Sequence, residues 1–502
     1  MKRLCCLIII LISALAQAQE FKLDWDASAR IAGTTGEYMP FWARTGEDGI
    51  LPVRSSGLMT AGAEFSYKGA KGLDIEAGAN LVGAVAMKSP LEDKTVYGMV
   101  DRLYLSGSWK MLHLDIGMKP RNKELGDLSV TGGNLIMTGN ARNMPGINAW
   151  SDWIYFEKWH LLGIKGNFAH YQLNDNRYIQ DAMIHSKSVA VKLGWRDIVE
   201  IEAGLDHWAQ WGGVSPALGQ RPASFKDYVR ILFGQNGGDD ATLSDQLNAL
   251  GNHLGREYLR LNYNGPLFKV SLQYDMPYDD GKNIIQTQTF PDGVWSLKFS
   301  NNSRDAVVTD VIYEYIQTTW QSGDTHDRAA TEEEMTKDYG KYVYWQDPNH
   351  HFYGRMVLGG RDNYFGHSEY RSGWTYFGRT IGLPLILPSA PNAEGMTIGI
   401  VNNRVRGHHF AVKGNICNVP YIFKSTYTSN WGTYSTSADS FFGARPKQLS
   451  LALEVELGKQ VTNLPVTFAV GAYGDFGELY QDCAGLTLRV LYKGSRPIGK
   501  GF

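Results

Sequence analysis

Residues 73–80 read LDIEAGAN, and this alternation of apolar and polar residues recurs along most of the chain. In a strand, Leu73, Ile75 and Ala77 fall on one face, whereas Asp74 and Glu76 fall on the other. Most of the alternating runs span about 8–11 residues, the length with which a tilted strand crosses a membrane. A soluble β-sandwich also alternates, but nothing fixes the length of its strands. The pattern therefore predicts an all-β fold, a transmembrane antiparallel β-barrel.

The first residues have the composition of an export signal. Lys2 and Arg3 are followed by an apolar stretch at 4–15 and by Ala16-Gln17-Ala18, a small-x-small cleavage site. We expect a signal peptide at 1–18, export through the Sec pathway and insertion into the outer membrane. Residues 19–57 are predicted to hold an N-terminal strand and the first loop, and 58–502 the remainder of the same single barrel domain.

The gaps between the alternating runs are alternately short and long, as they are between the periplasmic turns and external loops of bacterial barrels. The pattern predicts 18 strands, with both termini periplasmic, or 20 if 317–403 hides a hairpin. The expected strands lie near 20–31, 58–68, 73–82, 97–109, 112–118, 152–158, 162–171, 187–195, 198–208, 256–263, 268–275, 293–300, 306–316, 404–416, 421–430, 448–457, 465–473 and 485–492.

The side chains expected in the lumen carry both signs of charge, among them Glu202, Asp206, Arg260 and Asp275. Opposite charges that face each other across a barrel favour a mesh of ion pairs over an ion-selective pore, so we expect the long external loops to occlude the lumen. One loop contains a predicted helix that begins near Ser244 and ends at Gly255, with Leu247, Leu250 and Leu254 on one face.

Aromatic residues and arginines concentrate in two loops. Sugar rings stack on Trp and Tyr, and Arg binds carboxylates with two hydrogen bonds, so such clusters suit an anionic polysaccharide. The same residues are equally suited to packing loops against an acidic lumen or to lining the membrane interface. The candidate polysaccharide-binding residues are Trp208, Trp211, Arg361, Tyr364, Tyr370, Arg371, Trp374, Tyr376 and Arg379.

Composition and motifs argue against several other functions. A net charge of −2 leaves no broad nucleic-acid footprint. The chain lacks the nucleophile elbow, zinc-protease, phosphate-loop and dinucleotide motifs, so we expect neither an enzyme nor a cofactor. The adjacent pairs His350-His351 and His408-His409 point to opposite faces of a strand, so we expect no metal site. After signal removal only Cys417 and Cys483 remain, and in an oxidising compartment they can either pair as a disulfide or stay free.

Several long motifs resemble the capsule assembly Wzi family, in the branch found in Bacteroidetes. They are GNARNMPGI at 139–147, DHWAQWGG at 206–213, the SFKDY…GGDDA…SDQLNALGNHLG run at 224–255, DNYFGHSEYRSGWTYFGRTIG at 362–382 and NNRVRGHH at 402–409. The resemblance spans most of the mature chain. Enterobacterial members carry an N-terminal helical bundle, but here the residues after 19 read FKLDWD, and no amphipathic helix is expected before Leu58.

The resemblance implies an occluded barrel of 18 strands that acts as a lectin. Such a protein would bind capsular or exopolysaccharide at the cell surface and support capsule assembly or attachment without catalysis. Its other expected partners are outer-membrane lipid or lipopolysaccharide and the barrel-assembly machinery, and a monomer is expected. The alternative is a diffusion channel or carbohydrate-selective porin with an open lumen. A membrane hydrolase built from separate strands is a third reading.

Overall fold

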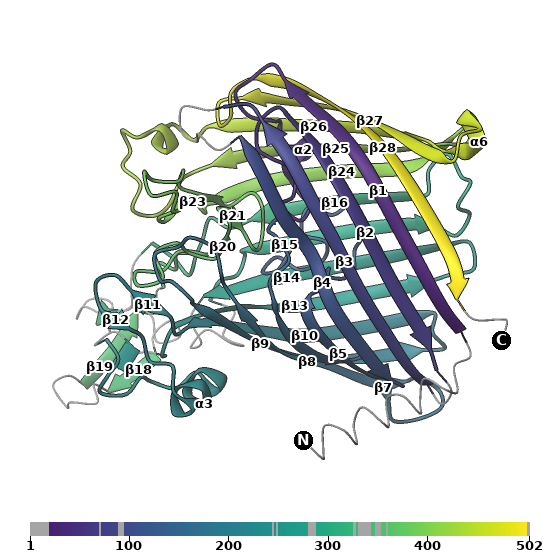
Figure 1. Ribbon diagram of the computed structural model, residues 1–502. Helices are drawn as coiled ribbons and strands as arrows, with labels where there is room; N and C mark the ends of the chain where they lie inside the picture. Colours follow the sequence, from purple (N-terminus) through teal and green to yellow (C-terminus); the bar gives the residue numbers. More distant parts are fainter. Residues whose placement is uncertain are drawn as a thin grey trace, which may run out of the picture.

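The computed structural model describes residues 20–69, 72–88, 95–242, 245–246, 249–279, 288–324, 328–329, 343–346, 353–357 and 360–498. The expected signal peptide at 1–18 lies outside these residues. Within them, 18 antiparallel strands form a closed barrel (Figure 1). The strand count is therefore 18 rather than 20.

Each barrel strand pairs with its neighbours in chain order. The strands are β1 (Glu20–Thr34), β2 (Ser56–Lys68), β3 (Leu73–Ala86), β4 (Val96–Trp109), β5 (Leu112–Met118), β6 with β7 (Gly146–Ser151 and Ile154–Tyr155), β8 (Leu162–Gln172), β9 (Met183–Trp195), β10 (Val199–Trp211), β13 (Asn252–Asn264), β14 (Phe268–Asp279), β15 (Gly293–Asn301), β16 (Asp310–Gln317), β24 (Val405–Ile416), β25 (Val419–Asn430), β26 (Lys447–Leu457), β27 (Val466–Gly477) and β28 (Cys483–Ile498).

The barrel closes where the first strand meets the last. β1 pairs with β2 on one side and with β28 on the other, and Trp25 lies opposite Gly494 across this seam. A Cβ atom at Gly494 would lie 2.3 Å from the Trp25 ring, so any larger residue there would force the indole to move. The start of β1 at Glu20 and the end of β28 at Ile498 lie at the end with the short turns, which we call the short-turn end; the long connections gather at the opposite, loop end (Figure 1).

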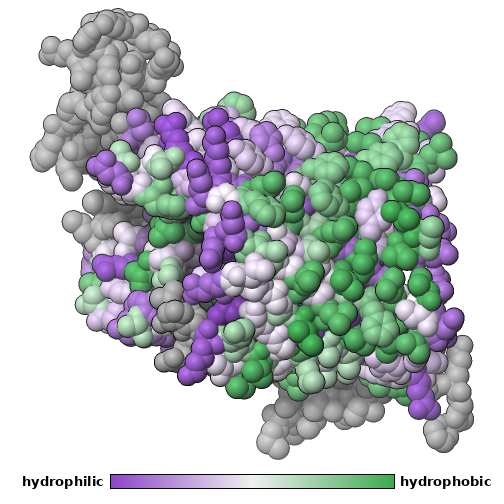
Figure 2. All heavy atoms as spheres, turned by 90° about the horizontal axis from the view of Figure 1, so that it is seen from above, coloured by the Kyte–Doolittle hydropathy of each residue, from purple (hydrophilic) through white to green (hydrophobic). Residues whose placement is uncertain are grey.

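The outer face of the barrel is apolar although it is exposed. Ile31, Met59 and Leu81 each expose more than half of their surface, and Trp109 and Trp195 do so at the short-turn end. Figure 2 shows a broad hydrophobic belt bordered by hydrophilic residues. This arrangement is the lipid-facing band, with flanking aromatic residues, of a membrane barrel. No helix among the described residues is long and apolar enough to cross a membrane.

The remaining elements belong to loops at the loop end or to short turns. The short strands are β11 (Val214–Ser215), β12 (Gly219–Gln220), β17 (Arg328–Ala329), β18 (Val343–Gln346), β19 (Tyr353–Val357), β20 (Thr375–Tyr376), β21 (Arg379–Thr380), β22 (Leu387–Pro388) and β23 (Ile400–Asn402). The helices are α2 (Phe41–Arg44), α3 (Phe225–Phe233), η3 (Phe441–Ala444) and α6 (Lys459–Thr462).

Two sequence-based expectations need correction, and one alternative that the sequence left open is decided. The strand expected at 152–158 lies mainly at Gly146–Ser151, where Ile147 pairs with Ile116 of β5. The helix expected over 244–255 does not reach Gly255: residues 245–246 are helical, but Leu254 and Gly255 lie in β13, whereas Ser244 and Leu247 lie outside the described residues. The same connection also carries α3, which is capped by Ser224 and was not predicted. Cys417 lies in a turn at the short-turn end and Cys483 at the loop end, so the two are free and do not form a disulfide.

Candidate functional site at the loop end

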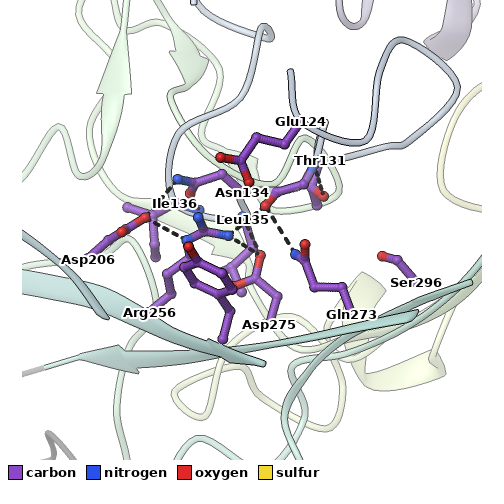
Figure 3. Close-up of polar contacts among 12 residues, drawn as sticks. Glu124, Thr131, Asn134, Leu135, Ile136, Asp206, Arg256, Gln273, Asp275 and Ser296 are labelled. Atoms are coloured by element: carbon purple, nitrogen blue, oxygen red, sulfur yellow. Dashed lines mark hydrogen bonds and ion pairs between the residues drawn. The ribbon is translucent and has the colours of Figure 1, made fainter. Parts of the chain in front are cut away.

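The connection between β5 and β6, residues 119–145, folds into the barrel; we call it the inner loop. Arg256 on β13 is its main anchor, and its side chain is 4% exposed. The Nε atom donates to Asp206 Oδ2 at 2.6 Å, and one terminal nitrogen donates to Asp275 Oδ2 at 3.1 Å and to the Gly133 carbonyl at 2.5 Å (Figure 3). Since β10, β13 and β14 are adjacent strands, the alternation that directs these three side chains inward brings them together.

The two carboxylates that hold Arg256 also bind the inner loop directly (Figure 3). Asp275 Oδ2 accepts from the Leu135 amide at 3.0 Å, and Asp206 Oδ2 accepts from the Asn134 side chain at 3.0 Å. Gln273 adds a hydrogen bond to the Gly133 carbonyl at 3.1 Å. Wall charges and loop backbone therefore form one buried network, as the charges of both signs in the lumen predicted.

The opposite side of the inner loop is held by other strands. Glu314 on β16 accepts from Ser129 Oγ at 2.6 Å and from the Val130 amide at 2.7 Å. A ring nitrogen of His409 on β24 lies 2.8 Å from the Leu128 carbonyl. The inner loop is thus attached to several consecutive strands of the wall, from β10 to β24.

Near the short-turn side of the inner loop, Glu124 binds Arg260 and lies 3.0 Å from Lys165. Burial alone would raise the pKa of the Glu124 carboxyl, but the neighbouring Arg260, Lys165 and Arg256 outweigh burial and lower it. Glu124 is therefore charged at neutral pH, and its ion pairs add to the attachment of the loop.

Residues 360–404, which we call the cap loop, lie over the inner loop. The Trp374 indole donates to the Ile136 carbonyl at 2.7 Å, and the Leu383 amide donates to the Leu135 carbonyl at 2.8 Å. The Trp374 and Trp208 rings meet edge to face at 6.0 Å. Apolar residues of both loops form one buried cluster with wall residues such as Ile184, Ile316 and Ala452. This cluster is a hydrophobic core inside the barrel.

Most of the aromatic residues predicted to bind polysaccharide are part of the protein core in the structure. Their exposed fractions are at most 7%: Trp208, Trp211, Tyr364, Tyr370, Trp374 and Tyr376. Tyr364 donates to Asp292 at 3.1 Å, Tyr370 donates to the Gly212 carbonyl at 3.2 Å, and Tyr376 donates to Asn174. Trp211 is separate from the others, because it lies on the outer face of β10 beneath α3. The structure thus brings Trp208 to the cap loop but not Trp211.

The predicted arginines differ in their surroundings. Arg379 donates to the carbonyls of Arg44 at 2.6 Å and Leu51 at 2.8 Å, which ties the cap loop to the first loop. Burial, together with the nearby Arg44 and Arg142, lowers the pKa of Arg379 to about 9. Arg371 is exposed, and its guanidinium lies 4.8 Å from the centre of the Tyr178 ring. Arg371 is therefore the predicted residue with the best access to a ligand in solution.

A second group of aromatic and basic residues faces outward at the loop end; sequence reasoning singled out only Arg361 among them. Trp320 is 46% exposed. Tyr434 donates to the Trp320 carbonyl at 2.6 Å, and the Arg404 guanidinium lies 3.9 Å from the Tyr434 ring centre. Arg361 donates to the Tyr434 carbonyl at 3.1 Å. We call Trp320, Arg361, Arg404 and Tyr434 the outer patch. Its members come from two connections, β16 to β24 and β25 to β26, and no motif in the sequence joins them.

Two cavities remain within the barrel on either side of the inner loop. The larger has a volume of about 550 Å³ and is lined by charges of both signs, including Arg30, Arg102, Lys424 and Glu454. The smaller, of about 210 Å³, is lined by Lys165, Ser186 and Trp208 among others. Lys123, Thr131 and Thr138 of the inner loop border both cavities, so this loop is the partition between them. In the part of the chain that is described, no three potential ligand side chains cluster as a metal site.

Comparisons with known proteins bear on the fold. No protein-family model and no curated sequence matches the chain. Among solved structures, it is similar to Wzi of Escherichia coli, an outer membrane protein involved in group 1 capsule assembly and described as a carbohydrate-binding β-barrel. The identity is 13%, the match covers 97% of this chain and 86% of Wzi, and the TM-score is 0.53.

The chain also aligns with OccAB4 of Acinetobacter baumannii, with 11% identity, coverage of 96% and 99% and a TM-score of 0.46. OpdK of Pseudomonas aeruginosa gives 11% identity, coverage of 95% and 100% and a TM-score of 0.47. At these identities the likeness shows the fold alone. The chain is an outer-membrane β-barrel of 18 strands, distantly similar to Wzi.

Proposed function

We propose that this barrel binds surface polysaccharide at its loop end and supports capsule assembly or attachment, without catalysis and without conducting large solutes. The observation that carries the proposal is the hydrophobic core that the inner loop and the cap loop build across the lumen. A core of this kind leaves little free cross-section for diffusion, whereas it holds the outer surface of the cap loop rigid. A rigid surface suits ligand binding because less conformational entropy is lost.

The binding surface in this proposal consists of Arg371 with Tyr178 and of the outer patch. These are the aromatic and guanidinium pairs that solvent reaches, and they suit the apolar faces and acidic groups of a polysaccharide. Wzi, described as a carbohydrate-binding barrel, offers a precedent on a similar fold. Each stacked ring is expected to contribute about 1 kcal/mol, so binding would depend on several weak contacts along one chain.

The test is the retention of polysaccharide on cells that produce variants of this protein. We expect Arg371→Ala combined with Trp320→Ala to reduce the retained polysaccharide by roughly fivefold or more, the effect of losing about 1 kcal/mol or more. Arg304→Ala is the matched control, because its side chain is 79% exposed at the short-turn end. Equal retention by both variants would argue against the proposed surface.

A diffusion channel or carbohydrate-selective porin is the second candidate function. The cavity of about 550 Å³ with its charged lining favours it, since hydrated solutes could occupy such a space. Recordings in planar bilayers distinguish the two functions. Stable, large single-channel steps from the unmodified protein would support the porin and contradict a closed lectin, whereas a quiet bilayer with correctly folded protein would support the lectin.

A further inference from the structure

The helix α3 lies on the outside of the barrel wall. Its residue Ile231 packs against Ala209 and Trp211 of β10. Lys187 donates to the Leu232 carbonyl, and the Tyr228 hydroxyl lies 3.2 Å from His185 Nδ1. His185 and Lys187 face outward on β9, because they alternate with Ser186 and Ser188, which line an interior cavity. The connection from β10 to β13 thus folds outward, unlike the inner loop.

A second apolar side of α3 points away from the barrel, although Lys187 Nζ of β9 lies 5.9 Å from the centre of the Phe233 ring. Phe225, Val229 and Phe233 are spaced i, i+4 and i+8, so they form one stripe along the helix. Phe225 is 81% exposed and Phe233 67% exposed, whereas Ile231 on the other side is completely buried. Two large aromatic side chains at such exposure are unfavourable in water and favourable in a lipid environment.

The level of α3 along the barrel axis suggests what covers this stripe. A lipid-facing band about 25 Å tall, crossed by strands tilted by about 40°, takes roughly 10 residues of each strand. On β9 the exposed apolar residues run upward from Trp195 only as far as Val189. Counting about ten residues from Trp195 reaches His185, the position under α3. On β10 the same count from Val199 reaches Ala209, which α3 also covers.

We propose that α3 is an interfacial helix that inserts Phe225 and Phe233 into the outer leaflet of the membrane. The helix completes the lipid-facing band where the wall itself stops presenting apolar residues. The surface is continuous, since the lipid-facing Phe168 ring contacts His185 at 4.9 Å and His185 contacts Tyr228 of α3 at 5.4 Å.

The polar residues beside the stripe fit the same partner. Lys226 is exposed and Arg230, which is paired with Asp227 at 2.8 Å, is partly exposed; Arg230 lies one turn before Phe233, and Lys226 one turn before Arg230. An amphipathic helix in an interface typically presents basic residues to lipid phosphates in this way. The proposal depends on the membrane location of the barrel and not on polysaccharide binding, so it can hold if the proposed function fails.

Site-directed spin labelling of the full-length protein tests the proposal. With Cys417 and Cys483 replaced by serine, Phe225→Cys and Phe233→Cys are labelled with a nitroxide in vesicles of phosphatidylethanolamine and phosphatidylglycerol. Collision with oxygen, which dissolves in lipid, is compared with collision with a water-soluble nickel chelate. We expect both labels to favour oxygen, as does a label at Leu193, which faces lipid and is 51% exposed.

Glu394→Cys is the matched aqueous control, because Glu394 is exposed in the cap loop. Its label is expected to favour the nickel chelate. The proposal is overturned if labels at 225 and 233 behave like the label at 394. It is also overturned if they are shielded from both reagents, since a protein partner or a second copy would then cover the stripe. All four positions are exposed, so the substitutions are compatible with folding, which heat-dependent gel mobility verifies.

Discussion

At the scale of single residues, Arg256 is a buried charge that needs several partners. It is buried and binds Asp206, Asp275 and the Gly133 carbonyl, so it joins three strands to the inner loop. Its removal leaves two buried carboxylates without their main counter-charge. Removing such a residue costs free energy mainly because its buried, charged partners are left unpaired, and less because an attraction is lost.

We therefore predict that Arg256→Ala lowers the free energy of unfolding by about 3–5 kcal/mol. Urea titration of the detergent-solubilised barrel, followed by gel mobility, measures the change. Arg489→Ala provides the comparison, because its ion pair with Glu456 has side chains 29% and 47% exposed. A pair in such a setting contributes about 0–1 kcal/mol. If the two variants lost the same free energy of unfolding, the Arg256 network would contribute no more to stability than an exposed ion pair.

Asp292, in the connection between β14 and β15, is predicted to make stability depend on pH. Burial raises the pKa of this carboxyl from 3.8 to about 6, although amides of Trp320 and Gln321 and the Tyr364 hydroxyl donate to it. The folded protein therefore binds this proton more tightly than the unfolded chain. Its contribution to stability increases as pH falls from about 7 to about 4 and is lost as pH rises through 6.

The variant Asp292→Asn cannot titrate. Across pH 4–7, the melting temperature of the unmodified protein, taken relative to that of the variant, should rise as the pH falls. Parallel profiles for the two proteins would mean that Asp292 has an ordinary pKa in the folded state.

At the scale of elements, two long connections from the same side of the barrel fold in opposite directions. The inner loop enters the lumen, where charged wall residues bind its backbone, and the connection that carries α3 covers the outer wall. The N-terminus of α3 forms a capping box: the Ser224 hydroxyl accepts from the Asp227 amide at 3.2 Å, and the Asp227 carboxylate accepts from the Ser224 amide at 3.0 Å. The sequence S-F-K-D thus specifies where the helix begins.

Ser224→Ala should destabilise α3 by about 1 kcal/mol, the usual effect of losing such a cap. Amide hydrogen exchange of residues 225–233 is expected to become roughly fivefold faster, because exchange follows local opening. Ser440→Ala removes the cap of η3, where Ser440 accepts from the Gly443 amide, and should leave exchange in α3 unchanged. Unaltered exchange in the Ser224 variant would indicate that packing against β10 alone maintains the helix.

The elements also show what can be derived from the sequence. Strand periodicity predicted the barrel because every second side chain of a strand meets lipid, a constraint that acts on each strand separately. The helix expected over 244–255 was extended too far because Leu250 and Leu254 have helical spacing, yet Leu250 packs outside the wall and Leu254 inside it.

The candidate site was harder to predict from the sequence than the barrel was. A sequence rich in Tyr, Trp and Arg has the composition of both a sugar-binding surface and a loop core. Which of the two it becomes depends on the direction in which the loop folds, and that is set by distant wall residues. Trp374 is thus completely buried while Arg371, three residues earlier, is exposed.

At the scale of the whole molecule, the inner loop separates two cavities inside the barrel. We predict that replacing 123–138 by a short Gly-Ser linker produces stepwise conductance in planar bilayers, because the cavities merge and the cap loop loses its contacts with Leu135 and Ile136. Replacing the exposed tip 391–395 by a linker of equal length should leave the bilayer quiet. A folded variant without 123–138 that still fails to conduct would show that the cap loop closes the pore alone.

The pairing of β1 with β28 has a consequence for the order in which the barrel folds and closes. β1 gains its second neighbouring strand only when it pairs with β28, the last strand. The sheet therefore stays open until the last residues are in place. Several anchors of the inner loop, by contrast, belong to the middle of the chain: Asp206, Arg256, Asp275, Glu314 and His409 lie on strands from β10 to β24. These residues can bind the inner loop while the sheet is still open. The loop can therefore be in place inside the barrel before β1 pairs with β28.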